Sequence, residues 1–357
     1  MSKASDVNNY PEIDGLRAVA VFSVIGFHLG LPGFGLGWAG VQLFFCISGF
    51  LITEGLRATK NRTLGTYLYR FFVRRALRIL PAYYSYLTLA LLLRWILVRN
   101  IDGWFYFVIY ANNYYQAFHG FQHSMLLSHL WSLAVEEQFY LLWPCVVFLA
   151  TSNSLFKISI GLVVIAPLIR FTTVSYTSNV TWEYASLLAS ADCLALGALY
   201  ALRPTSWKMK LPSWFVLMTA AVAGLLTIEI YHIGYSKMGD AQLWVASAQS
   251  HFLLTAVGII CIGMIGLSQT NLYLKTILSR QWLTHLGRIS YGLYLFHPLT
   301  FTVCTYVGTV ILGNKINHGA GHVLLIAAEI FCVVGIATAS YRWMERRFLM
   351  LKHILAP

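Results

Sequence analysis

The stretch Ile13–His28, IDGLRAVAVFSVIGFH, is the part of the sequence that decides the fold. It predicts an apolar helix with Arg17 near its start and His28 eleven residues later. Eleven residues make nearly three helical turns, so both side chains lie on one face, about 16 Å apart along the axis. With Arg17 at a membrane boundary, His28 reaches roughly the middle of a ~30 Å hydrocarbon layer. Because an imidazole at that depth is costly without partners, His28 is a candidate functional residue.

The composition is that of a polytopic membrane protein. Of the 357 residues, 58% are hydrophobic and 11% are charged, whereas soluble domains carry about 25% charged residues. The apolar runs are continuous, which favours spanning helices over the alternating segments of a β-barrel. The polar start shows no cleavable signal peptide, so we expect the first span to remain in the mature protein.

The distribution of charge and the cysteine spacing exclude several classes of ligand and site. The net charge of +12 comes from basic residues between apolar runs, which indicates membrane topology and an anionic ligand rather than nucleic acid. The six cysteines lie in apolar stretches without CxxC spacing, so we expect neither a disulfide framework nor a metal site. No P-loop, GxSxG or HExxH motif occurs.

The apolar runs predict an all-α polytopic transmembrane helix bundle, forming one integral-membrane domain over residues 1–357. About ten spans are expected: Leu16–Leu31, Trp38–Gly55, Ile79–Val98, Leu130–Ala150, Ile158–Val174, Ser186–Leu202, Trp214–His232, Phe252–Leu267, Ile289–Leu312 and His322–Tyr341. Basic residues gather in the loop from Arg57 to Arg78, which we expect to be cytoplasmic. Placing the other basic loops on the same side puts both termini in the cytoplasm and requires an even number of crossings. The segment Trp104–Phe118 is therefore expected to be interfacial or re-entrant.

Arg74, Arg75 and Arg78 form a basic group where the third span begins. Arg75 and Arg78 are three residues apart and share a helix face. Guanidinium groups bind phosphate oxygens bidentately, so a cytosolic phosphorylated ligand is one interpretation. The ordinary excess of basic residues in cytoplasmic loops is the other.

Two adjacent glutamates, Glu136 and Glu137, lie within an apolar run. Packing does not explain them, since a buried carboxylate costs several kcal/mol unless it is paired or protonated. His129, Ser132 and Glu136 are expected near one helical face. Carboxylates in this setting suit proton transfer. Other polar groups in apolar runs are Asp192, Glu329, Glu345 and His297. Asp192 and Glu329 are each expected to have a polar partner within the bundle.

Taken together, these stretches resemble the membrane-bound acyltransferase 3 family, the bacterial O-acyltransferases of surface polysaccharides. Five stretches occur in order across nearly the whole chain: EIDGLRAVAVFSVIGFH, VQLFFCISGFLI, RRALRILPAYY, HLWSLAVEEQFYLLWP and RISYGLYLFHPL. The family's pattern of Arg, ten residues and His falls on Arg17 and His28, and its paired arginines fall on Arg75 and Arg78. The family's tail commonly reads Glu-Arg-Pro, whereas this chain has Glu345-Arg346-Arg347.

The resemblance implies transfer of an acyl group, most often acetyl, from cytosolic acyl-CoA to a hydroxyl of a surface-polysaccharide or lipid-linked sugar such as O-antigen or exopolysaccharide. It implies a protein of the bacterial cytoplasmic membrane, surrounded by lipid, that uses acetyl-CoA as donor and no metal. The chain resembles the stand-alone members, which lack an added extracytoplasmic hydrolase-like domain. A macrolide or another small glycosylated acceptor is an alternative.

The resemblance also implies roles for individual residues. His28 would be a general base or a transient acyl carrier, and Glu136 or Glu137 would orient the imidazole or the sugar. Arg75 and Arg78, with Arg74 beside them, would hold the CoA phosphates, and Arg17 would lie near the donor. A further group is expected to contact the acceptor: His129, Trp131, Ser132 and His297.

A proton-coupled transporter or flippase is the alternative from another class. In that case His28, Glu136 and Glu137 would form a proton relay. Such proteins are often built from inverted repeats, and we find no internal repeat in this sequence. A transporter would accumulate substrate, whereas an acyltransferase would release CoA as a free thiol.

Overall fold

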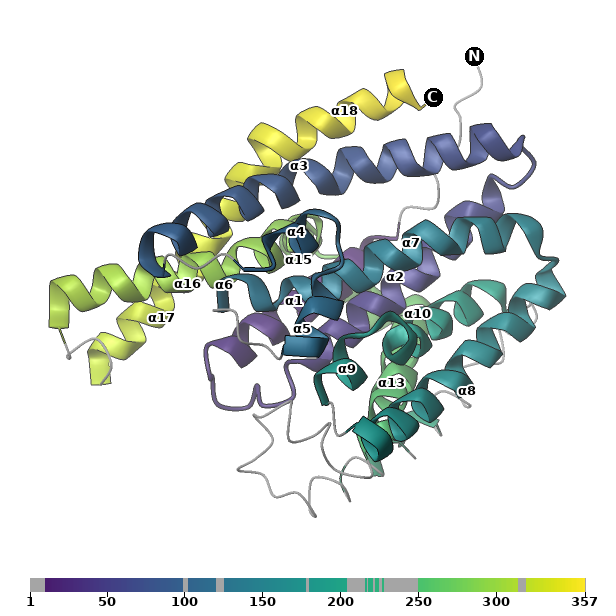
Figure 1. Ribbon diagram of the computed structural model, residues 1–357, viewed down its shortest axis with the longest axis horizontal. Helices are drawn as coiled ribbons and strands as arrows, with labels where there is room; N and C mark the ends of the chain where they lie inside the picture. Colours follow the sequence, from purple (N-terminus) through teal and green to yellow (C-terminus); the bar gives the residue numbers. More distant parts are fainter. Residues whose placement is uncertain are drawn as a thin grey trace. The chain divides into compact units, whose positions relative to one another are not determined.

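The computed structural model describes residues 10–98, 102–119, 125–177, 180–203, 216, 218–220, 222–224, 227, 250–313 and 319–356. Within this part the chain is helical and contains no strand, which confirms the all-α prediction. The helices, labelled in Figure 1, are α1 (Pro11–His28), α2 (Ala39–Ala58), α3 (Leu64–Val98), α4 (Trp104–Val108), α5 (Asn112–His119), α6 (Met125–Ser128), α7 (Leu130–Leu149), α8 (Ser152–Thr177), α9 (Val180–Ala185), α10 (Leu187–Leu202), α13 (Ser250–Thr270), α14 (Leu272–Leu278), α15 (Gln281–Arg288), α16 (Ser290–Leu312), α17 (Gly319–Ser340) and α18 (Arg346–Leu355).

The chain divides into two compact units, each made of two segments. Unit 1 comprises Met1–Leu64 and Val135–Arg288, and unit 2 comprises Gly65–Ala134 and Ile289–Pro357. Helix α7 begins in unit 2 and continues into unit 1.

In unit 1, α10 packs against α2, α8 and α13, and α1 packs against α2, α14 and α15. Figure 1 shows α8, α10 and α13 as neighbouring helices. The α2–α10 contact is close because each helix presents a glycine to the other. A Cβ at Gly49 would overlap the Leu194 carbonyl, and a Cβ at Gly197 would overlap the Cys46 carbonyl. Small residues that let two backbones approach are typical of helix packing in membranes.

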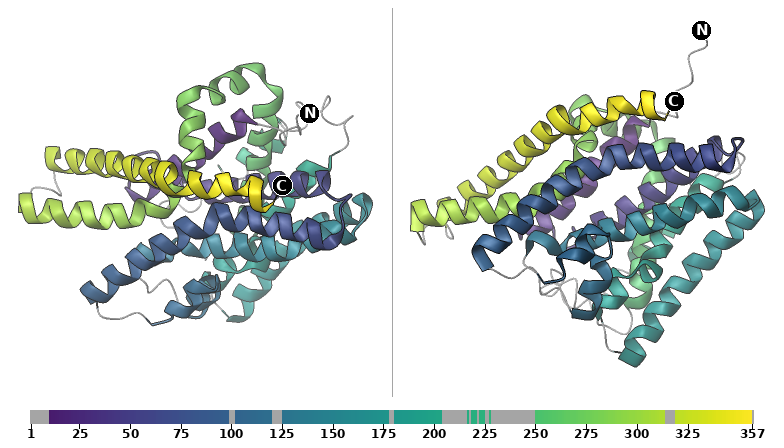
Figure 2. Two further views of the ribbon diagram at one scale, coloured as in Figure 1. Left: turned by 90° about the horizontal axis from the view of Figure 1, so that it is seen from above. Right: turned by 45° about the horizontal axis from the view of Figure 1, so that its top comes forward.

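In unit 2, α16 and α17 lie side by side, as both views in Figure 2 show. Their contact is close at Gly292, where an added Cβ would lie 3.3 Å from the Cα and Cβ of Ala337. Helix α17 continues through a π-helical turn, Tyr341–Glu345, into α18. Helix α3 contacts α16 through Tyr291, whose hydroxyl donates to the Ile79 carbonyl at 3.2 Å.

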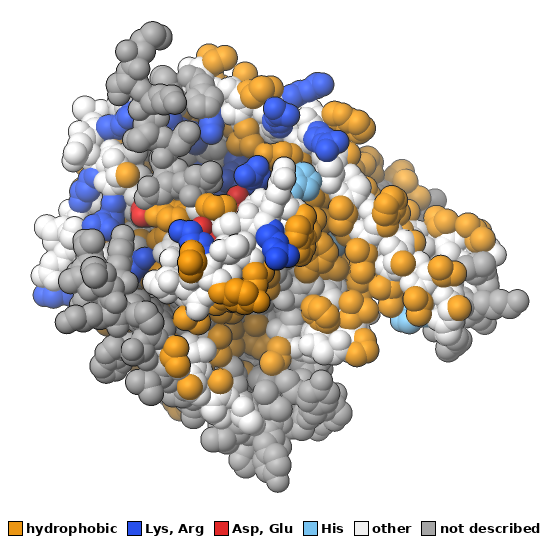
Figure 3. All heavy atoms as spheres, turned by 180° about the vertical axis from the view of Figure 1, so that it is seen from behind, with side chains coloured by type: hydrophobic (Ala, Val, Ile, Leu, Met, Phe, Trp, Pro, Cys, Tyr) orange, Lys and Arg blue, Asp and Glu red, His pale blue; other side chains and the backbone are white. Residues whose placement is uncertain are grey.

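Seven helical segments in the described part are long and apolar enough to cross a membrane, and α10 is a shorter apolar helix. Large hydrophobic side chains are exposed on α16 and α17; for example, Val310 is 69% and Phe331 81% exposed. Broad areas of exposed hydrophobic side chains are visible in Figure 3. An apolar surface of this kind suits contact with lipid acyl chains. The described part of the chain therefore has the apolar helices and the apolar surface of a helical membrane protein.

Nine of the ten predicted spans fall on described helices, and the predicted span Trp214–His232 lies largely outside the described residues. Helix α1 covers Leu16–His28 of the first predicted span. With Glu12, Asp14 and Arg17 among its 18 residues, it is not one of the seven segments. The total of ten crossings and the cytoplasmic position of the termini stay predictions.

In two segments the observed secondary structure differs from the structure that hydropathy alone predicts. The basic stretch Arg57 to Arg78 was expected to be a loop, but α3 begins at Leu64 and includes its second half. Arginine, leucine and alanine are strong helix formers, and the helix continues through Pro81 to Val98. The segment Trp104–Phe118 contains two short helices, α4 and α5, so it does not cross as one continuous helix.

Candidate functional site

Helix α1 carries Arg17 and His28, and the local sequence explains where this helix begins and ends. Pro11 occupies the first helical position, where its missing N–H costs nothing, and Glu12 lies in the first turn, where acidic residues are favoured. The helix ends at His28, and Gly30 follows with a φ of +63°. Arg17 and His28 are both half-buried. The structure thus places them on one helix, as predicted.

Helix α2 is held tightly against α1. A Cβ at Gly40 would overlap the Ala20 carbonyl, and one at Gly37, just before α2, would overlap the Ser23 carbonyl. Substitution at either glycine would therefore push apart the helix that carries His28 and its neighbour.

The part of α7 that belongs to unit 1 is tied to α2 by two side-chain hydrogen bonds. The Ser48 hydroxyl donates to Oε1 of Glu136 at 2.8 Å, and the Trp143 indole donates to the Thr53 hydroxyl at 2.8 Å. Glu136 and Glu137 are half-buried. Ser48 was not among the predicted site residues. A hydroxyl beside Gly49 in an apolar run was the only signal for it.

The α1–α7 group comprises Arg17, His28, Ser48, Glu136 and Glu137. All five lie in unit 1. Helix α2 contacts α1 by packing and holds α7 by hydrogen bonds, so it is the shared neighbour of the two helices that carry the predicted catalytic residues.

A second polar group lies inside unit 2. Its members are Tyr86, His129, Ser132, Tyr294 and His297, called the histidine cluster below. All five are buried. The ring centroids of His129 and His297 are 5.4 Å apart, and Tyr86 meets His129 edge-on at 5.5 Å.

Hydrogen bonds fix the histidine cluster in place. The hydroxyls of Ser132 and Tyr294 are 2.6 Å apart and share a hydrogen bond, and each lies 3.1 Å from the His129 carbonyl, which accepts from the hydroxyl whose proton is not used between them. Nε2 of His129 lies 3.2 Å from the Leu295 carbonyl, and Nδ1 of His297 lies 2.8 Å from the Tyr294 carbonyl. The structure therefore brings together three of the four residues predicted to contact the acceptor.

The shared helical face of His129, Ser132 and Glu136 stays a prediction. Ser132 and Glu136 lie on α7, and His129 is the turn residue directly before its first residue, Leu130. Tyr86 and Tyr294 were missed as cluster members because tyrosines are common in the apolar stretches of this chain. Trp131, the fourth residue predicted to contact the acceptor, is buried at the start of α7.

The three predicted phosphate-binding arginines lie on α3 in unit 2. Arg74 donates through Nε and Nη2 to the Ala356 carbonyl, at 3.2 and 2.9 Å, and so ties α3 to the end of α18. The guanidinium carbon of Arg75 lies 6.0 Å from the Phe71 ring centroid. Arg74 therefore has a structural role in holding the end of α18 against α3.

Other polar residues in the apolar helices have structural partners. Asp192 pairs with Arg170 at 2.8 Å, and the Thr255 hydroxyl donates to the same carboxylate at 2.6 Å. Glu329 accepts from Thr305 at 3.1 Å. The expectation that Asp192 and Glu329 pair within the bundle is confirmed. Arg170 was missed, although a lone arginine within an apolar run is itself a signal.

Glu345 is buried in unit 2 and accepts from the Ser340 hydroxyl at 3.1 Å. It closes the π-helical turn after α17. Within the described part of the chain, no group of three or more His, Cys, Asp or Glu side chains could hold a metal ion.

The chain is similar to a known family of acyltransferases and to individual O-acetyltransferases. A family model described as an acyltransferase domain matches residues 10–343. The chain is 29% identical over 354 residues to the peptidoglycan O-acetyltransferase OatA of Listeria monocytogenes, covering 94% of this chain and 55% of that protein. It is 27% identical over 356 residues to the O-acetyltransferase OatA of Staphylococcus aureus, covering 94% of this chain and 56% of that protein.

The chain thus spans about half the length of the curated relatives it matches. No solved structure matches it. The family model covers all of the α1–α7 group, the histidine cluster and the three arginines of α3. On this match, the chain belongs to the acyltransferase 3 family.

Proposed function

We propose that this chain transfers an acetyl group from acetyl-CoA to a hydroxyl of a cell-surface polysaccharide sugar, at the bacterial cytoplasmic membrane. The family match supports acyl transfer, and the similarity to a peptidoglycan O-acetyltransferase and to another O-acetyltransferase supports acetyl as the group and a polysaccharide as the acceptor. The observation that carries the proposal is the α1–α7 group. It supplies an imidazole and two carboxylates in one compact unit, on helices that share α2 as neighbour.

In the proposed reaction, His28 accepts the proton of the acceptor hydroxyl while the oxygen attacks the thioester carbonyl carbon. The tetrahedral intermediate collapses, the C–S bond breaks, and the CoA thiolate leaves and takes up the proton. Glu136 or Glu137 would orient the imidazole and stabilise its charged form. Arg17 would lie toward the donor, about 16 Å from His28 along α1.

A covalent route through an acetyl-imidazole on His28 uses the same residues. The two routes differ when the acceptor is absent. In the covalent route, label from acetyl-CoA stays on the purified protein, whereas in the general-base route it does not.

The donor and the acceptor would each have a separate group of residues. Arg75 and Arg78 are the candidates for the CoA phosphates, since guanidinium groups bind phosphate oxygens bidentately. The histidine cluster and Trp131 are the candidates for contacts with the sugar. Ligand sites are lined mainly by apolar and aromatic side chains with a few polar groups that fix orientation, and these residues have that composition.

The direct experiment compares surface glycans from cells with and without this protein by mass spectrometry. The proposal predicts a mass increase of one acetyl group on a glycan fragment, and this fragment identifies the acceptor. With purified protein, it predicts release of CoA as a free thiol. Accumulation of substrate without CoA release would instead support a transporter.

The variant His28→Ala tests the proposed base. We expect acetylation to be lost while the amount of protein in the membrane stays at the wild-type level. Retained acetylation would remove His28 from the mechanism.

A further inference from the structure

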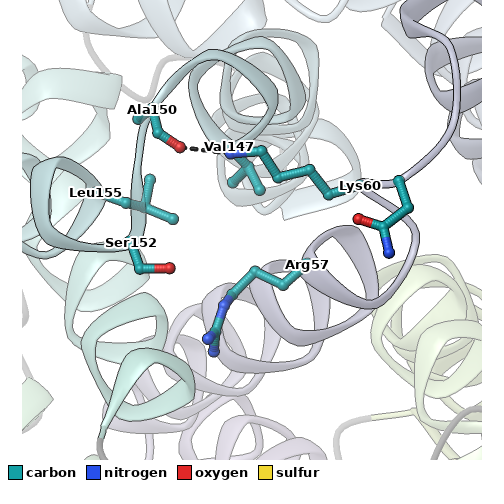
Figure 4. A pocket seen from close by; sticks show the side chains of 7 residues that line it. Arg57, Lys60, Val147, Ala150, Ser152 and Leu155 are labelled. Carbon is teal, nitrogen blue, oxygen red and sulfur yellow. Dashed lines mark hydrogen bonds between the residues drawn. The ribbon is translucent and has the colours of Figure 1, made fainter.

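Unit 1 contains a cavity of about 210 Å³ that takes no part in the proposed transfer. Its volume is well above the ~10–15 Å³ that one water molecule needs. The lining residues, shown in Figure 4, come from the end of α2 and from the α7–α8 connection: Arg57, Lys60, Asn61, Val147, Ala150, Ser152 and Leu155.

Two cations face this cavity, and each is anchored at the end of a helix. Nη1 of Arg57 donates to the Ala201 carbonyl at 2.8 Å, near the end of α10. The Lys60 ammonium donates to the Ala150 carbonyl, just beyond the end of α7. Basic side chains are favoured at helix carboxyl ends. These carbonyl contacts explain how the two side chains are held, but not why both line one cavity.

The charge of the lining is unbalanced. Among the described residues that line it, there are an arginine and a lysine but no aspartate or glutamate. A guanidinium has five N–H donors and an ammonium has three, so one carbonyl contact leaves each cation with further donors. Two cations at one cavity repel each other, and an anion between them would turn this repulsion into attraction.

The remaining lining suits a small anion with an apolar continuation. Asn61 and Ser152 are exposed and offer an amide and a hydroxyl, while Val147 and Leu155 are buried and apolar. Ser152 opens α8, where the preceding Thr151 already accepts the Ser154 N–H at 3.1 Å. The Ser152 hydroxyl is therefore not needed as the helix cap.

We propose that this cavity binds a phosphate group, carried either by an anionic lipid head group or by a soluble phosphate ligand. Arginine and lysine bind phosphate oxygens through charged hydrogen bonds, and serine and asparagine can add neutral ones. Arg57 and Lys60 belong to the segment that the sequence predicts to be cytoplasmic, where both sources of phosphate occur. None of the residues assigned to acetyl transfer lines the cavity, so the inference does not depend on the proposed function.

Two measurements on the purified full chain distinguish the sources of phosphate. In the lipid arm, the protein is reconstituted with phosphatidylcholine and phosphatidylglycerol, and native mass spectrometry counts the phosphatidylglycerol that it retains. In the soluble arm, inorganic phosphate is titrated in detergent, and the rise in Tm gives an apparent affinity. The test variant is Arg57→Gln/Lys60→Gln. The control is Arg62→Gln, which removes a charge from the turn that carries Lys60 but lies outside the cavity.

We expect the double variant to lose bound phosphatidylglycerol, or to bind phosphate about tenfold more weakly, or both. The control should behave as the wild type does. A difference in one arm alone assigns that source. Equal behaviour of wild type and double variant in both arms would overturn the proposal.

The double variant also loses two helix-end contacts and could misfold for that reason. A second variant therefore tests the proposal with both contacts kept. Ser152→Glu places a carboxylate in the cavity, keeps both cations, and adds an acidic residue at a helix start, where it is favoured. We expect it to lose the response in the arm in which the wild type responds. An unchanged response in that arm would also overturn the proposal.

Discussion

The Ser48 hydroxyl on α2 donates a 2.8 Å hydrogen bond to Oε1 of Glu136 on α7. Hydrogen bonds to charged groups contribute about 1.5–3 kcal/mol, so this contact holds the carboxylate in a defined position. The half-buried glutamate that the sequence singled out thus has a partner on a helix that also packs against the helix carrying His28.

Replacing Ser48 with Ala should lower kcat for acetyl transfer by about 10- to 150-fold, because Glu136 loses a charged hydrogen bond that positions it. The measurement is a steady-state assay of CoA release in membranes with matched protein levels. Ser154→Ala, at an exposed position on α8, is the control and should leave kcat unchanged. If Ser48→Ala changes only KM, the contact with Glu136 does not act on the chemical step.

The sequence predicted more of the fold than of the site. The apolar runs predicted the helical class and most helix positions because burial in lipid demands continuous apolar helices. They did not predict that α3 begins at Leu64, since basic residues at its start reduce hydropathy without weakening the helix. Spacing identified Arg17 and His28 on one helix. It could not identify partners from distant segments, such as Ser48 for Glu136 or Tyr294 for His129, because those depend on tertiary packing.

Adding a methyl group at Gly49 should separate α2 from α10. A Cβ there would overlap the Leu194 carbonyl, and overpacking of this kind costs about 1–3 kcal/mol. We expect Gly49→Ala to lower the Tm of the detergent-purified protein. Gly55→Ala, on the same helix with open space around its Cβ position, should not lower it. Equal Tm values for the two variants would mean that the close approach of α2 and α10 is not important for stability.

Breaking the buried pair of Arg170 and Asp192 should destabilise unit 1 strongly. The side chains are 0% and 1% exposed, and removing one partner of such a pair costs about 3–5 kcal/mol. We expect both Arg170→Met and Asp192→Leu to reduce the free energy of unfolding by this amount. The double variant should lose less than the sum, because no uncompensated charge then remains. Additive losses would show that the two side chains do not interact energetically.

The Tyr294 hydroxyl contacts both Ser132 and the His129 carbonyl, so Tyr294→Phe should loosen the histidine cluster. We expect KM for the sugar acceptor to rise about 3- to 10-fold, while KM for acetyl-CoA stays constant. Tyr306→Phe is the control, since this tyrosine lies on the same helix and is 66% exposed. If the KM for acetyl-CoA rises instead, the histidine cluster contacts the donor and not the acceptor.

The three arginines of α3 should separate into two classes. Arg74 donates twice to the Ala356 carbonyl, so Arg74→Gln should lower the Tm and leave the KM for acetyl-CoA nearly unchanged. Arg75→Gln/Arg78→Gln should raise the KM for acetyl-CoA at least about tenfold, because each lost charged contact with phosphate costs about 1.5–3 kcal/mol. Dephospho-CoA donors sharpen the measurement, since wild type and Arg74→Gln should discriminate against them and the double variant should not. If all three arginines affect only Tm, the basic face of α3 anchors the helix and the donor phosphates bind elsewhere.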